Sequence, residues 1–124
     1  MKKDKPASKD SGHSFEDYIK RAANPLLVLL LLRERPMYVY EMAQALEDRS
    51  DGRYSISLLY PVLYRLTSQG YVQEGEKKVS EDNRVRQYYE ITPEGIAYYE
   101  EICNVYDQMM DTIQKIRDSG VTPQ

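Results

Sequence analysis

The sequence predicts a mainly α-helical fold with a small β-ribbon and one long helix toward its C-terminal end. Apolar residues recur at the spacing of a buried helical face in several stretches before Gly70, and the two segments that follow Gly70 favour strands. After Thr92 the apolar residues alternate at intervals of three and four as far as about Arg117. A chain of 124 residues accommodates these elements in one domain with a modest core.

The first predicted helix follows an N-terminal tail. Residues 1–13 contain lysines but no apolar run of the signal-peptide kind, so we expect a disordered tail. Phe15–Ala23 has a helical composition, and Asn24-Pro25 favours a new helical start, which predicts two segments or one kinked helix. The apolar run 26–32 has seven residues, against roughly 20 for a membrane span. We therefore place this run in the core.

Two further helices are predicted before the ribbon. The first carries one apolar stripe and ends at Ser50-Asp51-Gly52; the stripe consists of Val39, Met42, Ala43 and Leu46. The second has an apolar inner face of Leu59, Val62, Leu63 and Leu66. Pro61 predicts that this helix is kinked in its first turn or begins late, and either Ser55 or Ser57 would cap it, with Ser55 preferred.

Gly70 ends the third helix and introduces the ribbon, since glycine tolerates a positive φ. One strand is predicted over Tyr71–Lys77 and the other over Arg84–Ile91, with residues 78–83 as the tip. At the two-residue period of a strand, Arg84 and Arg86 share one face.

Thr92-Pro93-Glu94 predicts the start of the long helix, because it offers a cap, a first-turn proline and an acid near the positive helix end. We expect a dimerisation helix over 93–117 and a tail over 118–124, with the N-terminal helix assisting the dimer. The 3, 4 spacing is that of a coiled-coil seam. The predicted dimerisation residues are Tyr99, Ile102, Tyr106, Met109, Ile113 and Ile116.

The order of elements favours DNA binding by a winged helix-turn-helix domain over residues 14–92. A helix with a polar outer face fits the major groove, and an arginine-bearing ribbon suits the phosphate backbone. The candidate DNA-binding residues are Tyr38, Tyr40, Ser55, Ser57, Tyr60, Pro61, Tyr64, Arg65, Lys77, Lys78, Arg84 and Arg86. Two alternatives stay open: Arg65 pairs with an acid of the preceding helix, and the ribbon arginines are merely solvated.

Charge narrows the form that DNA binding can take. The net charge of -3 and the pI of about 5.2 exclude a protein that coats nucleic acid through bulk positive charge. Between residues 74 and 86 of the ribbon four bases and four acids cancel; they are Lys77, Lys78, Arg84, Arg86, Glu74, Glu76, Glu81 and Asp82. The rival hypothesis is therefore a winged-helix module that binds protein partners and no DNA.

Over roughly residues 26–117 the chain resembles the PadR-like family of winged-helix transcriptional regulators, in its short subtype with one C-terminal dimerisation helix. The resemblance is carried by Tyr38–Met42, Leu59–Leu66, Gly70–Val72 and Arg84–Gly95. It implies a homodimeric repressor that binds a pseudo-palindromic operator on double-stranded DNA. The segment Asp82–Gln87 departs from the family, whose wings usually resemble glycine-glycine-arginine-proline-arginine-lysine.

Other functions receive less support from the sequence. Twelve tyrosines suit interfaces and pockets for planar molecules, so Tyr98, Tyr99 and Tyr106 are candidates for a small planar effector; the alternative is dimer packing alone. The sole histidine, His13, lies in the predicted tail, and no metal-ligand spacing or phosphate-binding glycine loop is present. We expect no enzyme activity, no cofactor and no metal, and a cytoplasmic location without membrane association.

Overall fold

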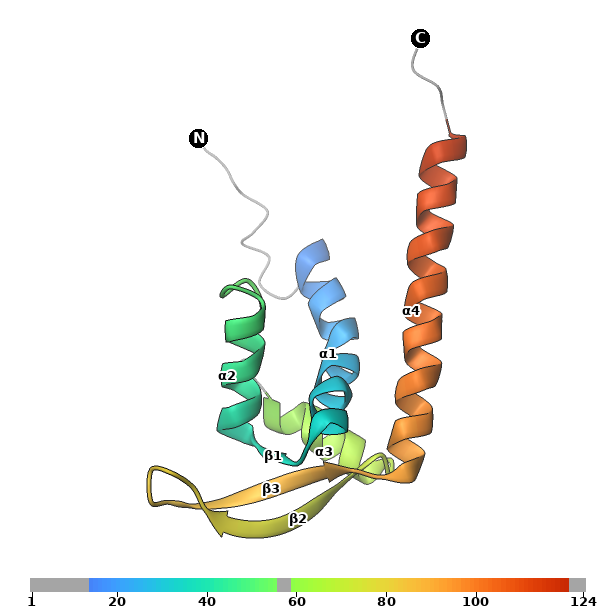
Figure 1. Ribbon diagram of the computed structural model, residues 1–124. Helices are drawn as coiled ribbons and strands as arrows, with labels where there is room; N and C mark the ends of the chain where they lie inside the picture. Colours follow the sequence, from blue (N-terminus) through green and yellow to red (C-terminus); the bar gives the residue numbers. More distant parts are fainter. Residues whose placement is uncertain (1–13, 56–58, 121–124) are drawn as a thin grey trace, which may run out of the picture.

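The computed structural model describes residues 14–55 and 59–120. Its elements are α1 (Phe15–Glu34), β1 (Met37–Tyr38), α2 (Val39–Arg49), α3 (Leu59–Ser68), β2 (Val72–Val79), β3 (Val85–Ile91) and α4 (Pro93–Ser119). α1 and α2 lie over one face of the sheet, α3 lies alongside β2, and α4 rises from the end of the sheet (Figure 1). The predicted fold class is confirmed. The predicted tail over 1–13 and the candidate Ser57 lie outside the described residues. So do residues 121–124 of the tail predicted over 118–124.

α1 is one continuous helix and not two segments. It begins after Ser14, whose side chain accepts a hydrogen bond from the Asp17 amide at 3.1 Å. Pro25 lies inside the helix, where it removes a single backbone donor. The packing of the apolar turns that follow offsets this loss, because Val28 and Leu29 are completely buried. Within the described ranges, none of the helices combines the length and apolar character needed to cross a membrane.

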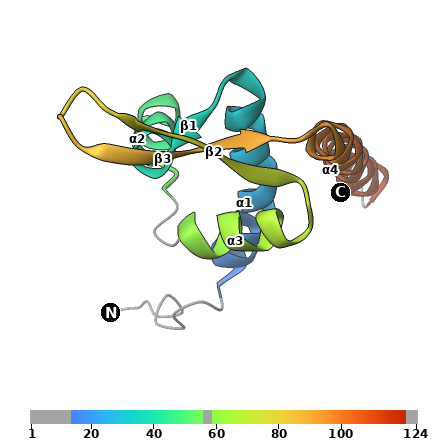
Figure 2. The ribbon, with the colours of Figure 1, turned by 90° about the horizontal axis from the view of Figure 1, so that it is seen from below.

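The sheet has three strands in the order β1-β3-β2, all antiparallel, so the prediction of a two-stranded ribbon was incomplete (Figure 2). The missed strand is β1, in which Met37 pairs with Tyr89 and Tyr38 with Tyr88. Two residues are too few to produce a recognisable alternation. β1 exists because the buried Met37 brings the chain alongside β3.

α2 and α3 end in the same way, with a left-handed residue and a pair of closing backbone hydrogen bonds. In α3 the amide of Gly70 donates to Thr67 at 3.0 Å and that of Tyr71 to Leu66 at 2.9 Å. Gly70 has a φ of 85°, as predicted. After α2 two successive residues are left-handed, Asp51 with a φ of 55° and Gly52 with a φ of 79°. These turns fix the positions of the segments that follow each helix.

The described part of α3 begins at Leu59, directly after the undescribed residues 56–58, and contains Pro61. The predicted kink or late start of this helix therefore stays a prediction. The predicted cap at Ser55 or Ser57 stays a prediction, because residues 56–58 lie outside the described ranges. The inner face is as predicted, and its buried members are Leu59, Val62, Leu63 and Leu66.

The core lies where α1, α2, α3 and the sheet meet. The largest fully buried side chains are Leu29, Leu31, Met37, Met42, Leu63, Leu66, Val28 and Val72. Tyr54 attaches the turn after α2 to α1, because its hydroxyl donates to the Lys20 carbonyl at 2.9 Å and also contacts the Asn24 side chain. Burial raises the pKa of the Tyr54 hydroxyl, which therefore remains a donor at neutral pH.

α4 is joined to the domain at its first turn. Thr92 caps it by accepting a hydrogen bond from the Gly95 amide at 2.9 Å, and its hydroxyl donates to the Gly70 carbonyl at 2.7 Å. Gly95 is buried against Tyr71, and a Cβ there would overlap the Tyr71 carbonyl oxygen. The ring of Tyr98 stacks on that of Tyr71 with a centroid separation of 4.1 Å. The start of α4 and the turn after α3 thus form one rigid junction.

Candidate nucleic-acid interface

The outer face of α3 is polar and aromatic. Tyr60 and Tyr64 are 64% and 76% exposed, and Pro61, Arg65 and Ser68 are exposed with them. Tyrosine hydroxyls and a guanidinium are groups that donate to phosphates and base edges. Arg65 forms no ion pair with the preceding helix, which is described in full, so the alternative of pairing with one of its acids is not realised.

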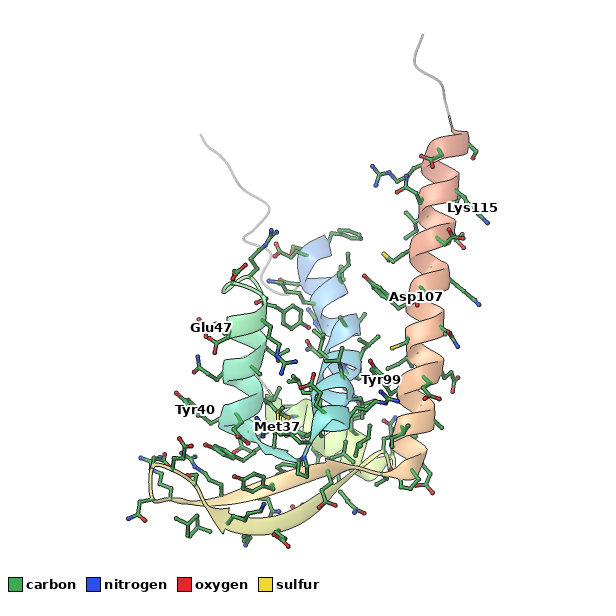
Figure 3. The ribbon with its side chains drawn as sticks, viewed as in Figure 1. Met37, Tyr40, Glu47, Tyr99, Asp107 and Lys115 are labelled. Carbon is green, nitrogen blue, oxygen red and sulfur yellow. The ribbon has the colours of Figure 1, made fainter. Side chains whose placement is uncertain are left out.

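An open groove brings candidate residues from three elements together. It lies between the start of α2, the start of α3 and β3, and four of the predicted DNA-binding residues line it: Tyr38, Tyr40, Tyr60 and Arg86. Figure 3 shows Tyr40 at the end of α2 nearest the hairpin. Residues separated in sequence by more than 40 positions therefore contribute to one surface.

The start of α2 is held by charged hydrogen bonds. The Tyr38 amide donates to the Glu41 side chain at 3.2 Å, and Arg35 lies 3.3 Å from the same carboxylate. The ring of Tyr38 meets that of Tyr88 edge to face at 5.3 Å. These contacts orient Tyr38 so that its ring supports the guanidinium of Arg86 at 5.0 Å, in a cation–π arrangement.

The β2–β3 hairpin forms the wing, and its tip is a tight turn. The Ser80 amide donates to the Arg84 carbonyl at 2.8 Å and the Asn83 amide to the Ser80 carbonyl at 2.9 Å. Asn83 adopts a φ of 65°, a conformation that asparagine tolerates better than most residues. The tip projects from the domain on the side away from α4 (Figure 2).

Asp82 occupies the centre of this tip. Its carboxylate lies 2.6 Å from Nη2 of Arg86 and 4.0 Å from Nε of Arg84, and the Ser80 hydroxyl donates to it. The Ser80 hydrogen bond and, next, the Arg86 hydrogen bond hold the pKa of Asp82 below its usual range. Asp82 is thus charged at neutral pH, and both arginines predicted to contact DNA face it.

The two arginines differ in exposure. The side chain of Arg86 is 23% exposed, between Asp82 and the Tyr38 ring, whereas that of Arg84 is 72% exposed. On the neighbouring strand Lys78 lies over the Tyr88 ring at 4.8 Å and 4.0 Å from Glu76. Lys77 is exposed, opposite Gln87 in the register. Lys78, Arg84 and Arg86 therefore each contact an acid of the wing, and Lys78 and Arg86 also contact a tyrosine ring.

The candidate residues fall into separate groups. Tyr64 and Arg65 lie on α3 outside the groove, Lys77, Lys78 and Arg84 lie along the wing, and Ser55 precedes the undescribed segment 56–58. Sequence reasoning missed the roles of Asp82, Glu41 and Ser80. For Asp82 a signal existed, because an acid that opens a tight hairpin lies close to bases just across the turn.

The tyrosines proposed for a planar effector differ in environment. Tyr98 stacks on Tyr71, and Tyr99 lies on the side of α4 that faces α1, where Arg33 is 5.6 Å from its ring (Figure 3). A hydrogen bond with Cys103, followed by burial, raises the pKa of Tyr99. Tyr106, further along, is half exposed. Two of the three rings are therefore packed within the protomer.

Three helices packed with a small sheet, a polar outer face on the third helix and a hairpin that bears two arginines define a winged helix-turn-helix protein of the DNA-binding class. The profile of the transcriptional regulator PadR-like family matches residues 28–101, which is more than half of the chain. The chain belongs to this family of DNA-binding transcriptional regulators, which are not enzymes.

Solved structures and a curated relative agree with this assignment. A transcriptional regulator from Clostridium thermocellum is 32% identical, with a TM-score of 0.71, over 79% of this chain and 93% of its own. A PadR family transcriptional regulator from Eggerthella lenta is 29% identical, with a TM-score of 0.75, over 92% and 98%. Uncharacterized protein X of Lysinibacillus sphaericus is 29% identical over 89 residues, covering 70% of this chain and 81% of the relative.

Proposed function

We propose that this PadR-like regulator acts in the cytoplasm as a homodimeric repressor that binds a pseudo-palindromic operator. Each protomer presents α3 to a major groove and the wing to the adjacent phosphates. The observation that carries the proposal is the outer face of α3, where exposed Tyr60, Tyr64 and Arg65 stand opposite a fully apolar inner face. A repressor role follows if the operator overlaps a promoter.

The dimer is supported by apolar surface that a monomer would leave in water. Beyond the junction with the core, α4 exposes a stripe consisting of Val105, Tyr106, Met109, Met110, Ile113 and Ile116. α1 also exposes Phe15, Tyr18 and Ile19 at its N-terminal end. Contiguous exposed apolar surface of this kind marks protein interfaces. We propose that the stripe, together with the start of α1, forms the homodimer interface.

Operator binding is tested by fluorescence anisotropy with duplexes from the region upstream of the gene, against a scrambled duplex, over a series of salt concentrations. Arg65→Ala and Tyr60→Phe should leave the melting temperature nearly unchanged and weaken operator binding, by about 1 to 3 kcal/mol for each lost base contact. Leu63→Ala, on the inner face, should instead lower stability by about 2 to 5 kcal/mol. Wild-type affinity in both outer-face variants would exclude this face as the DNA-binding surface.

Wing contact is tested separately. Arg84→Ala combined with Arg86→Ala should weaken binding to every duplex and flatten the slope of log affinity against log salt by about one unit per lost phosphate contact. An unchanged slope would leave both arginines without a role in DNA binding.

The charge-neutral wing favours one second candidate, a winged-helix module that binds a protein partner in place of DNA. It predicts that no duplex binds in a salt-dependent manner. A small planar effector at the dimer interface is a further proposal, supported by the half-exposed Tyr106 within the apolar stripe. A phenolic probe that raises the melting temperature of the wild type but not of Tyr106→Ala would support it.

A further inference from the structure

The wing tip contains a compact charge cluster, made of Ser80, Asp82, Arg84 and Arg86, which we call the tip cluster. Asp82 receives a hydrogen bond from Ser80, a direct ion pair from Arg86 and a longer one from Arg84. One carboxylate thus lies within 4.0 Å of both guanidinium groups that the proposed function assigns to phosphate. No described acid elsewhere on the wing pairs with either arginine.

The geometry of the turn holds Asp82 in place. The left-handed Asn83 and the backbone bonds between Ser80 and Arg84 close the hairpin directly around it. Arg86 is fixed from its other side by the Tyr38 ring, and Nε of Arg86 also donates to the Ser80 hydroxyl at 3.4 Å. The backbone and the neighbouring side chains therefore fix the pairing of Asp82 with Arg86. It is not an incidental contact between flexible side chains.

A phosphate and the Asp82 carboxylate are chemically similar acceptors for a guanidinium, since each offers two oxygens to its donors. DNA binding through the wing therefore exchanges one anion for another. This exchange reduces the gain from wing contact, and the reduction does not depend on the base sequence.

We propose that Asp82 is an affinity-setting residue, which holds Arg84 and Arg86 in the free protein and so weakens the wing's binding to any duplex. The proposal rests on the proposed DNA-binding function. It implies that discrimination between sequences comes from α3 and from the spacing of the two protomers, because Asp82 limits the general affinity that the wing adds. Operator and random duplexes are affected to the same degree.

The test compares Asp82→Asn with Glu81→Gln in the full chain. Both remove one negative charge from neighbouring exposed positions, but no described ion pair joins Glu81 to the arginines. Asparagine retains an oxygen that can accept from Ser80, so the turn is preserved. Asp82→Asn should tighten binding to operator and scrambled duplexes about three- to tenfold at low salt, with a salt slope steeper by at most about one unit. Glu81→Gln should change the affinity for either duplex by less than about twofold.

A second comparison isolates the arginines. In an Arg84→Ala, Arg86→Ala background, Asp82→Asn should have no larger effect than Glu81→Gln, because nothing remains to be released. Equal effects of Asp82→Asn and Glu81→Gln in the wild-type background would overturn the proposal. So would a full Asp82 effect without the arginines, which would indicate direct repulsion of phosphate.

Failure of the proposed function gives a different result. If no variant, including Asp82→Asn, binds any duplex at low salt, DNA binding itself is excluded and the role of Asp82 falls with it. If the wild type binds DNA and the double arginine variant binds more weakly, but Asp82→Asn matches Glu81→Gln, the DNA-binding function stands and the role of Asp82 alone is rejected. Circular dichroism and thermal unfolding confirm that each variant is folded.

Discussion

The first part of α4, residues 93–103, packs on the domain, whereas residues 104–119 extend beyond it (Figure 1). The seam spacing continues through both parts. In the first, Tyr99 and Ile102 contact the core of their own protomer. In the second, the seam residues from Tyr106 onward are exposed. The first part of the repeat is therefore covered by the core of its own protomer. The second part is left exposed by the described residues of that protomer.

This difference changes how the dimer should be tested. Ile102 lies in both the seam and the core packing, so replacing it with a charge would disturb the fold together with any interface. Positions beyond Tyr106 are free of this ambiguity, because none of them is among the described residues packed against the core. Comparison of the two parts of α4 thus separates folding from association.

The largest expected effect is loss of the dimer. Met109→Glu with Ile113→Glu should weaken dimerisation about a hundredfold or more, since two apolar side chains would be replaced by charges within one seam. Sedimentation over a range of protein concentrations measures it. Gln108→Glu with Gln114→Glu adds the same charge outside the seam and should leave the dimer intact. A dimeric Met109→Glu, Ile113→Glu variant would remove α4 from the interface.

The next effect concerns the junction of α4 with the domain. Gly95→Ala should lower the free energy of unfolding by about 3 kcal/mol, because its Cβ would overlap the Tyr71 carbonyl oxygen and lie 2.7 Å from the Ile91 side chain. Urea unfolding measures the loss. Gly120→Ala, whose Cβ would come no closer than 3.4 Å to another atom, serves as the control. Wild-type stability in Gly95→Ala would contradict the close approach at this junction.

A matched pair of tyrosines gives a smaller effect. Tyr98→Leu removes the stacking on Tyr71 and should cost about 0.5 to 1.5 kcal/mol of stability. Tyr106→Leu should leave the unfolding of the monomeric Met109→Glu, Ile113→Glu variant unchanged, because Tyr106 touches no core residue. Equal losses in the two variants would show that both rings contribute to the fold of one protomer.

The smallest effect is that of ion pairs. Arg49 binds Glu34 through two nitrogens at 2.7 and 2.9 Å, joining α1 to α2, and this hydrogen bonding lowers the pKa of Glu34 from 4.5. A lowered carboxyl pKa contributes stability above pH 4.5 that is lost as the pH falls through the folded-state value. Both side chains are about half exposed, so Glu34→Gln should cost less than about 1 kcal/mol at pH 7, and the cost should shrink as the pH falls below 4.5.

The control for this pair is Asp111→Asn, which breaks an ion pair with Lys115 inside the extended part of α4. Pairs within one exposed helix contribute about 0.3 to 0.5 kcal/mol at most. Thermal unfolding across pH should detect an effect for Glu34 and little or none for Asp111. A Glu34→Gln deficit that persists undiminished into acid would indicate packing and not charge.

The sequence by itself determined the local features of this protein. The inner face of α3, the stop at Gly70, the start of α4 and the repeat along it could all be predicted, because each depends on side-chain periodicity or on a backbone preference within a few residues. The family resemblance carried by the same motifs identified the class of regulator. It also selected the residues of the groove without indicating that they meet.

Only the tertiary structure decided the features that depend on distant partners. β1 forms because Met37 is buried beside β3, α1 continues through Pro25 because its later turns are packed in the core, and the α4 repeat divides into two parts where the domain ends. The tip cluster belongs to the same category. A charge count gives a neutral wing, but only the closed turn brings Asp82 within reach of both arginines, since electrostatic pairing depends on distance and not on composition.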